Sequence, residues 1–486
     1  MAFYIYDLIF LLIFCIAIAI FLYAKRKNLK RDMKIAFLYR SQWGVKLIKY
    51  IGKKYTKTLN FLKYVIIAMS YFLMAGILYL IFRSVYIYAR YPTTVTKLVK
   101  APPIAPVIPY FPTLFGMNDF FPPFPFVSFL VALAITAIVH EFSHGIFMAH
   151  NKVRIKSTGI LFLGPLLGAF VEQDEKDMEK IKKTDQMAIL GAGVFANIIT
   201  GLVFYLVWAG LFFITFTPSG AVFDTYATSI VDINNIESIG GIPINANNTQ
   251  EIINIINNSE LPVELVSYTN AELADFIKVV TKKRDFLITK ELLIKQLELN
   301  QGIVGLYEDL PAIREGLIGT IIEIDGEEIK THEDLTEILD NKKPGEEISI
   351  KTRFKDEIQE YEFELSQHPE NSSKPMIGIA NSRVKKNMAE SFSRLFKDLF
   401  TEYQFKSEFL VFLYYMVFWI FLINILVGFF NMLPLAILDG GRFFYLTVWG
   451  ITGSEKIGRR AFKWVGLIIL AGFILMMMSW LFGIVS

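Results

Sequence analysis

Cysteine is almost absent from this chain, which has a single thiol, Cys15, among 486 residues. One thiol can form no intrachain disulfide and cannot build a multi-thiolate metal site. Acidic residues are scarce in 25–57, where Asp32 is the one carboxylate among twelve Lys and Arg. A basic run beside an apolar segment is typical of a cytoplasmic juxtamembrane stretch rather than a nucleic-acid arm, so we expect no nucleic-acid partner.

Long apolar runs, in contrast, are plentiful, because the hydrophobic residues (53% of the chain) are gathered in blocks. A run of about 18 or more residues can cross a hydrocarbon layer of ~30 Å. The predicted spans are residues 4–24, 64–88, 124–149, 186–216, 407–430 and 463–484. A seventh stretch, 432–451, is interrupted by Pro434 and Asp439 and predicts a broken or partly inserted helix.

Positive charge sets the expected orientation of these spans. Basic residues place 25–57, 152–183 and 456–460 in the cytoplasm, which leaves the polar region 217–406 outside. The first residues lack the basic start of a secretory signal and predict a retained anchor. We expect an integral, multi-pass protein of a prokaryotic cell membrane, with an organelle membrane as the alternative.

The polar region carries an internal repeat over 217–385. Ile236–Ile244 and Ile321–Ile329 share a pattern of apolar residues around a glycine turn, and an amphipathic stretch follows each. Short glycine-containing strands at 302–306 and 376–380 close the two copies. This order resembles a PDZ domain, whose open sheet edge binds a partner's chain end. A purely structural insert is the alternative.

The third span contains two histidines, His140 and His144, four residues apart. On a helix they lie on one face, one turn apart, where both imidazoles can meet a single metal ion. Glu141 follows the first histidine, as in the HExxH arrangement in which two histidines hold zinc and the glutamate takes a proton from water. Ionisable groups inside an apolar span are costly and rare without a function.

Two histidines are too few for a catalytic zinc, which has three protein ligands in most enzymes. Asp439 is the only carboxylate between Glu408 and Glu455, and its surroundings are apolar. The break at Pro434 and the freedom of Gly440 could turn this carboxylate inward. We predict Asp439 as the third ligand, although a helix-capping role would fit the residue alone.

These two motifs, with PDZ-like sequence between them, resemble the site-2 protease family of intramembrane metalloproteases. The similarity covers residues 124–451 and rests on matches at His140, Glu141, His144, Asn431, Pro434, Asp439 and Gly440. It implies Zn²⁺ held by the two histidines and the aspartate, with the glutamate as general base. It also implies that Asn431 holds substrate or the developing oxyanion.

Two other stretches fit the same family. The apolar segment 159–172 resembles its re-entrant β-hairpin, with Gly159, Gly164 and Gly168 as candidate substrate-binding residues, and a membrane-surface loop is the alternative. The stretch 191–197, rich in small residues, opens the next span. Its Asn197 is also a candidate for substrate binding, although interhelical packing is the favoured role.

The predicted fold class is an α-helical polytopic membrane protein of about six spans with an inserted α+β region of one or two PDZ-like domains. Its expected divisions are 1–123, an N-terminal pair of spans with a basic cytoplasmic loop and an outer Pro- and aromatic-rich loop; 124–216, the first half of the catalytic core; 217–306 and 307–385, the two PDZ-like copies; 386–451, the second half of the core; and 452–486, a C-terminal span.

The predicted function is zinc-dependent hydrolysis of peptide bonds in or near the transmembrane segments of single-span membrane proteins, as in regulated intramembrane proteolysis. Two other classes are weaker. A metal transporter would explain intramembrane His and Asp but not a glutamate beside a ligand. An inactive peptide-binding scaffold would not need the intact Glu141.

Overall fold

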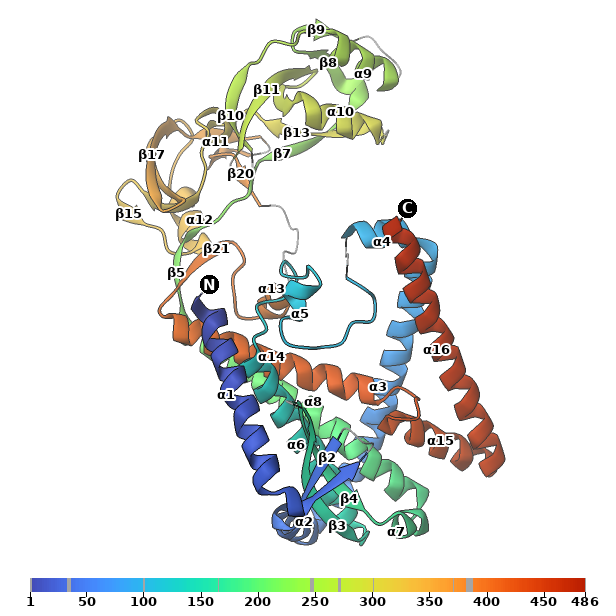
Figure 1. Cartoon of the computed structure of the whole chain (residues 1–486). Coiled ribbons are helices and arrows are strands. Elements are labelled where there is room, and N and C mark those ends of the chain that lie inside the picture. Colours follow the sequence, from blue (N-terminus) through green and yellow to red (C-terminus); the bar gives the residue numbers. More distant parts are fainter. Residues whose placement is uncertain are drawn as a thin grey trace. The chain divides into compact units, whose positions relative to one another are not determined.

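The computed structural model describes residues 2–32, 36–98, 101–164, 166–244, 249–269, 272–299, 301–369, 371–381 and 388–485 (Figure 1). The chain divides into two compact units. The first comprises Met1–Thr215 and Ser407–Ser486, with a short piece at Lys386–Ala389, and the second comprises Phe216–Lys385 and Glu390–Lys406.

Within the described residues, six helices of the first unit are long and apolar enough to cross a membrane. They are α1 (Ala2–Ala24), α3 (Thr56–Arg90), α6 (Phe126–His150), α8 (Lys183–Thr215), α14 (Glu408–Asn431) and α16 (Glu455–Val485). Each matches one predicted span. The broken stretch is also confirmed, since a non-helical turn precedes the short helix α15 (Asp439–Thr452).

Helix α8 packs against α3, α6, α14 and α15. Small residues allow α8 and α14 to approach closely: a Cβ on Gly201 of α8 would lie 2.6 Å from Ile425 of α14. In return, a Cβ on Gly428 of α14 would lie 2.7 Å from Ile198 of α8. Because lipid tails are as apolar as these side chains, close van der Waals packing rather than hydrophobic burial stabilises such a helix pair.

A four-stranded antiparallel sheet lies in the same unit, in the order β1 (Leu29–Asp32), β2 (Ala36–Ser41), β3 (Ile155–Leu163), β4 (Leu166–Gln173). The predicted hairpin is therefore formed by β3 and β4, while Pro165 at its turn lies outside the described residues. The basic segment, expected as a loop, instead forms β1, β2 and the helix α2 (Trp43–Lys54). It does so because the outer edge of β3 offers backbone groups that β2 pairs with.

Four shorter elements complete the first unit. They are a 3₁₀ turn at Arg26–Asn28, α4 (Pro92–Leu98), α5 (Phe111–Leu114) and α7 (Glu175–Lys180). The segment 91–123, expected as an extended loop, thus contains two short helices. The end of this segment packs on α14: the ring centroid of Phe121 lies 5.9 Å from that of Trp419, and the indole N–H donates to the Pro123 carbonyl. The ring of Phe124, the next residue, lies 4.1 Å from Trp419.

The first half of the second unit has its own hydrophobic core beneath a sheet ordered β7-β13-β12-β11-β8-β9, with β10 paired to β11. Its elements are β7 (Thr228–Asp232), a 3₁₀ turn at Ile233–Asn235, β8 (Ile236–Ile239), β9 (Ile242–Pro243), α9 (Thr249–Asn258), β10 (Leu265–Thr269), β11 (Glu272–Thr281), β12 (Asp285–Thr289), α10 (Lys290–Glu298) and β13 (Ile303–Glu308).

The second half has a second core cluster, to which Phe276, Leu287 and Tyr307 of the first half also contribute. Its sheet is ordered β17-β16-β14-β5-β21, with β15 paired to β14. Its elements are β5 (Phe216–Ala221), α11 (Pro311–Arg314), β14 (Thr320–Ile324), β15 (Glu327–Glu328), α12 (His332–Asp340), β16 (Glu347–Phe354), β17 (Glu357–Glu364) and β21 (Thr401–Phe405). Two small pairs add β18 (Ser366–His368) with β19 (Asn371–Met376), and β6 (Thr225–Tyr226) with β20 (Ile379–Ala380). Helix α13 spans Met388–Ser393.

The internal repeat in the sequence corresponds to a repeated strand order. In the first half β8, β9 and α9 are followed by β11, which pairs with β8 and, across a charged turn, with β12. In the second half β14, β15 and α12 are followed by β16, which pairs with β14 and β17 in the same way. The first half adds β10 and α10 to this plan. The resemblance of each half to a PDZ domain stays a prediction.

Candidate metal centre

Helix α6 presents the two predicted histidine ligands on one face. His140 and His144 are 9% and 6% exposed, and their ring centroids lie 4.5 Å apart at an interplanar angle of 85°. The spacing of four residues places the rings one turn apart, as expected from the helix geometry. Both side chains therefore point to the same interior point from one rigid element.

Asp439 is the first residue of α15, directly after the broken stretch. The two glycines that follow it allow the start of α15 to pack on the preceding turn: a Cβ on Gly440 would lie 2.3 Å from the Met432 carbonyl carbon. A Cβ on Gly441 would lie 2.1 Å from the Leu435 carbonyl oxygen. The Asp-Gly-Gly sequence thus fixes the carboxylate through backbone packing that no other residue type would permit.

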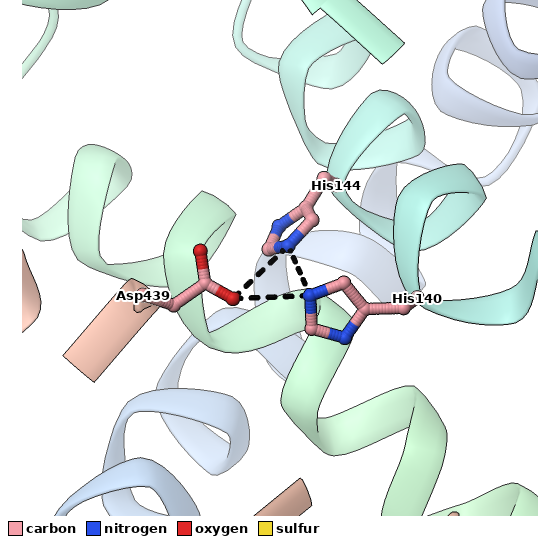
Figure 2. A group of neighbouring side chains, drawn as sticks. All are labelled: His140, His144 and Asp439. Atoms are coloured by element: carbon pink, nitrogen blue, oxygen red, sulfur yellow. Dashed lines mark hydrogen bonds and ion pairs between the residues drawn. The ribbon is translucent and has the colours of Figure 1, made fainter. Parts of the chain in front are cut away.

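The three side chains converge, as Figure 2 shows. The Asp439 Oδ2 atom lies 3.1 Å from His140 Nε2 and 3.3 Å from His144 Nε2, and the two Nε2 atoms are 3.0 Å apart. A tetrahedral zinc with bonds of 2.0–2.1 Å separates its ligand atoms by about 3.3 Å. The donor types and their spacing therefore fit a divalent ion bound by two imidazoles and one carboxylate.

The opposite nitrogen of each ring also has a partner. His144 Nδ1 donates to the Ile189 carbonyl of α8 at 2.6 Å, which leaves Nε2 with its lone pair toward Asp439. His140 Nδ1 lies 3.1 Å from the side-chain amide of Asn197, also on α8. The contact of His144 with the Ile189 carbonyl was not predicted, because a tertiary contact to a backbone carbonyl has no signal in the sequence. For Asn197 an interhelical role was expected, but His140 was not predicted as its partner.

A cavity of about 590 Å³ opens beside the three side chains. Its wall includes two further predicted residues, Glu141 and Asn431, together with Thr136. The amide N–H of Val171 in β4 donates to Glu141 Oε2 at 3.0 Å, so the glutamate is tied to the edge strand of the sheet. The arrangement brings a carboxylate, an amide side chain and a strand edge together beside the two imidazoles and the Asp439 carboxylate.

The glycines predicted to bind substrate lie elsewhere on the hairpin. The described residues of the hairpin that line the cavity are Val171, Glu172 and Gln173 of β4. Gly159 is in β3, where a Cβ would lie 2.2 Å from the Tyr39 carbonyl oxygen, and Gly168 is in β4 beside Leu161. Gly164 is at the turn with a φ of +60°. Their contact with substrate stays a prediction, while the close pairing of β2 and β3 explains why Gly159 has no side chain.

Comparison with known proteins gives two matches. The model of peptidase family M50 matches residues 128–478, which is more than two thirds of the chain. An uncharacterized protein of Methanocaldococcus jannaschii is 31% identical over 194 residues. That alignment covers 39% of this chain and 48% of the relative, so the chain matches about half the length of its curated relative.

Proposed function

This chain belongs to peptidase family M50, the site-2 protease family, and from that premise we propose that it is a zinc endopeptidase cutting membrane proteins in or near their transmembrane segments. The family and the six apolar helices make it a membrane-embedded metallopeptidase. The observation that carries the finer proposal is the convergence of His140, His144 and Asp439 beside a cavity that Glu141 and Asn431 line.

The proposed roles follow from the position of each group. The chemistry that zinc supplies in such a site is Lewis-acid polarisation of the scissile carbonyl and an acidified water. Glu141 accepts the proton of the attacking water and returns it to the leaving amine. Its Oε2 atom accepts a hydrogen bond from the Val171 amide, so we assign proton transfer to the other oxygen, Oε1. Asn431 donates to the oxyanion that develops on the substrate carbonyl.

Substrate would bind as an added strand on the open edge of β4. In an antiparallel sheet, alternate residues of a strand direct their amide groups to the same edge. Val171 directs its N–H to Glu141, away from its cross-strand neighbour Thr158 in β3. Ala169 and Gln173 therefore offer their backbone groups to an unwound substrate on that same side. Unwinding exposes the peptide bond, which a helix would shield with its own hydrogen bonds.

The proposed orientation places the second unit outside the cytoplasm and opens the site to the cytoplasmic side. Basic residues in 25–57, 152–183 and 456–460 favour this topology in a prokaryotic cell membrane. Helix α6 then runs inward, with His140 and His144 in its latter half. The PDZ-like halves would bind chain ends or exclude bulky outer domains, so that single-span proteins are cut after prior shortening, as in regulated intramembrane proteolysis.

The test compares the wild type with Glu141→Gln on a tagged single-span substrate in liposomes, together with zinc content. We expect zinc in both proteins and cleavage by the wild type alone, with a loss of at least about 100-fold in the variant, because a general base contributes 10²–10⁴-fold. Absence of zinc from both proteins would overturn the ligand assignment. Equal cleavage by both would overturn the role of Glu141.

A further inference from the structure

Helix α8 contacts the two candidate ligand rings through residues spaced one helical turn apart. A Cβ on Gly193 would lie 2.5 Å from His144 Nε2 and 2.8 Å from both Cε1 and Nδ1 of His140. Four residues later, the side-chain amide of Asn197 lies 3.1 Å from His140 Nδ1. Gly193 and Asn197 therefore face the same pair of rings, one by leaving space and the other by a polar contact.

The side chain of Asn197 is fully buried, and its Oδ1 atom has no hydrogen-bond partner among the described residues. An unpaired buried acceptor costs about 1–3 kcal/mol, so such a group calls for a reason. The oxygen and nitrogen of an amide are assigned from the hydrogen-bond network rather than from shape. A rotation of this amide by half a turn brings Oδ1, rather than Nδ2, to His140 Nδ1.

The ring itself decides between these two orientations. An imidazole that gives its Nε2 lone pair to a metal carries its hydrogen on Nδ1 and needs an acceptor there. His144 has such an acceptor in the Ile189 carbonyl, 2.6 Å from its Nδ1. For His140, the corresponding partner in the described structure is Asn197.

We propose that Asn197 is a positioning residue whose side-chain oxygen accepts the Nδ1–H of His140 and holds Nε2 toward the metal. The inference rests on the proposed metal site and assigns Asn197 a role other than binding substrate. Ring-orienting partners of this kind are worth about 10–100-fold in metal affinity. Asn197 lies near the middle of the 33-residue helix α8, so it acts from a rigid support rather than from a loop.

The test measures Zn²⁺ affinity of the full chain in detergent, by competition with a chelator, for Asn197→Leu and Asn197→Asp. Leucine has the same branched arrangement of side-chain heavy atoms but offers no acceptor, and we expect the Zn²⁺ affinity of this variant to fall by about 10–100-fold. Aspartate restores an acceptor and should bind Zn²⁺ at least as tightly as the wild type. The visible spectrum of the Co²⁺-loaded protein should change in the leucine variant and be retained in the aspartate variant.

Asn424→Leu is the matched control. Asn424 is also 0% exposed in a membrane helix, its Oδ1 also lacks a partner among the described residues, and its Nδ2 donates to Ile420 of its own helix. This variant should bind Zn²⁺ like the wild type. If Asn197→Leu also binds like the wild type, or if Asn197→Asp is weakened as much as Asn197→Leu, the positioning role is overturned while the protease proposal stands. A wild type that binds no Zn²⁺ overturns both.

Discussion

The geometry at His140 and His144 depends on a residue that carries no functional group. Gly193 approaches both rings so closely that a single methyl group would lie 2.5 Å from His144 Nε2. Real Cβ atoms do not approach other heavy atoms this closely, so the rings or the helices would have to move. Because a metal tolerates little displacement of its ligands, the absence of a side chain at this position is a requirement of the site.

Gly193→Ala should therefore weaken Zn²⁺ binding by at least about tenfold, which corresponds to ~1.4 kcal/mol. The measurement is chelator competition on the purified full chain. Gly210→Ala is the control, because Gly210 lies on the same helix with nothing within 4 Å of a Cβ. Alanine is favoured over glycine inside a helix by about 0.5–1 kcal/mol, so both variants gain the same intrinsic stabilisation of α8. Equal Zn²⁺ affinity of the two variants would contradict this reading.

The sequence indicates which side chains converge at this site, but it contains little signal for the contacts that support them. Helical spacing predicts which nearby side chains share a face, and this identifies His140, Glu141 and His144. Asp439 is readable because a carboxylate in an apolar stretch needs a partner. Val171 and Ile189 are not readable, since they act through backbone groups that any residue would supply. Asn197 is a candidate from the sequence, but its contact with His140 depends on how α6 and α8 pack.

At the scale of single elements, the N-terminus of α6 is capped by another helix. Pro125 at the N-cap makes no side-chain hydrogen bond, so the first N–H groups of α6 need outside acceptors. Asp7 of α1 accepts from Phe126 N at 2.7 Å and from Val127 N at 3.1 Å, and the Tyr110 hydroxyl also donates to it. Asp7 is 3% exposed, and its charge is stabilised there by the positive end of the helix dipole.

We expect Asp7→Ala to lower the unfolding free energy by about 1–2 kcal/mol, the range for loss of a helix cap. Asp7→Asn keeps one acceptor oxygen but loses the charge, so its effect should be intermediate. Thermal unfolding of the full chain in detergent measures both. Leu12→Ala on the same helix serves as the control, because Leu12 is 61% exposed and apolar. A destabilisation by Asp7→Ala no larger than that by Leu12→Ala would argue against the capping role.

Asp7 also has a recognisable signal in the sequence. It is the only acidic residue in the first span, and an ionisable group within a span is a reason to look for a partner. The pairing of β2 with β3, in contrast, could not be predicted from the sequence. Register between strands more than a hundred residues apart depends on tertiary contacts, and the basic composition of 25–57 masks its strand pattern.

At the scale of the whole chain, each of the two units has hydrophobic cores of its own. The second unit contains two cores, and the first contains separate clusters between its helices. The second unit is connected to the helices α8 and α14 by the strands β5 and β21. These strands pair with each other from Phe216↔Phe405 to Ala221↔Thr401. The polar insert could therefore be predicted from composition, whereas this two-stranded connection could not.

This connection permits a deletion that keeps the ends of α8 and α14 in register. Replacing residues 222–400 by Asn-Gly joins the directly paired residues Ala221 and Thr401 through a two-residue turn of the type that favours tight hairpins. If the insert excludes bulky outer domains, the shortened protein should cut a single-span substrate that still carries its folded outer domain, which the wild type should leave intact.

Cleavage of a short single-span substrate should change little, since Glu141 and the three candidate ligands lie in the first unit. The same replacement in a Glu141→Gln background should abolish both cleavages, which would assign the products to this site. If the shortened protein binds Zn²⁺ and cuts the short substrate but still spares the bulky one, the insert is not the barrier. Exclusion would then have to come from the membrane unit itself.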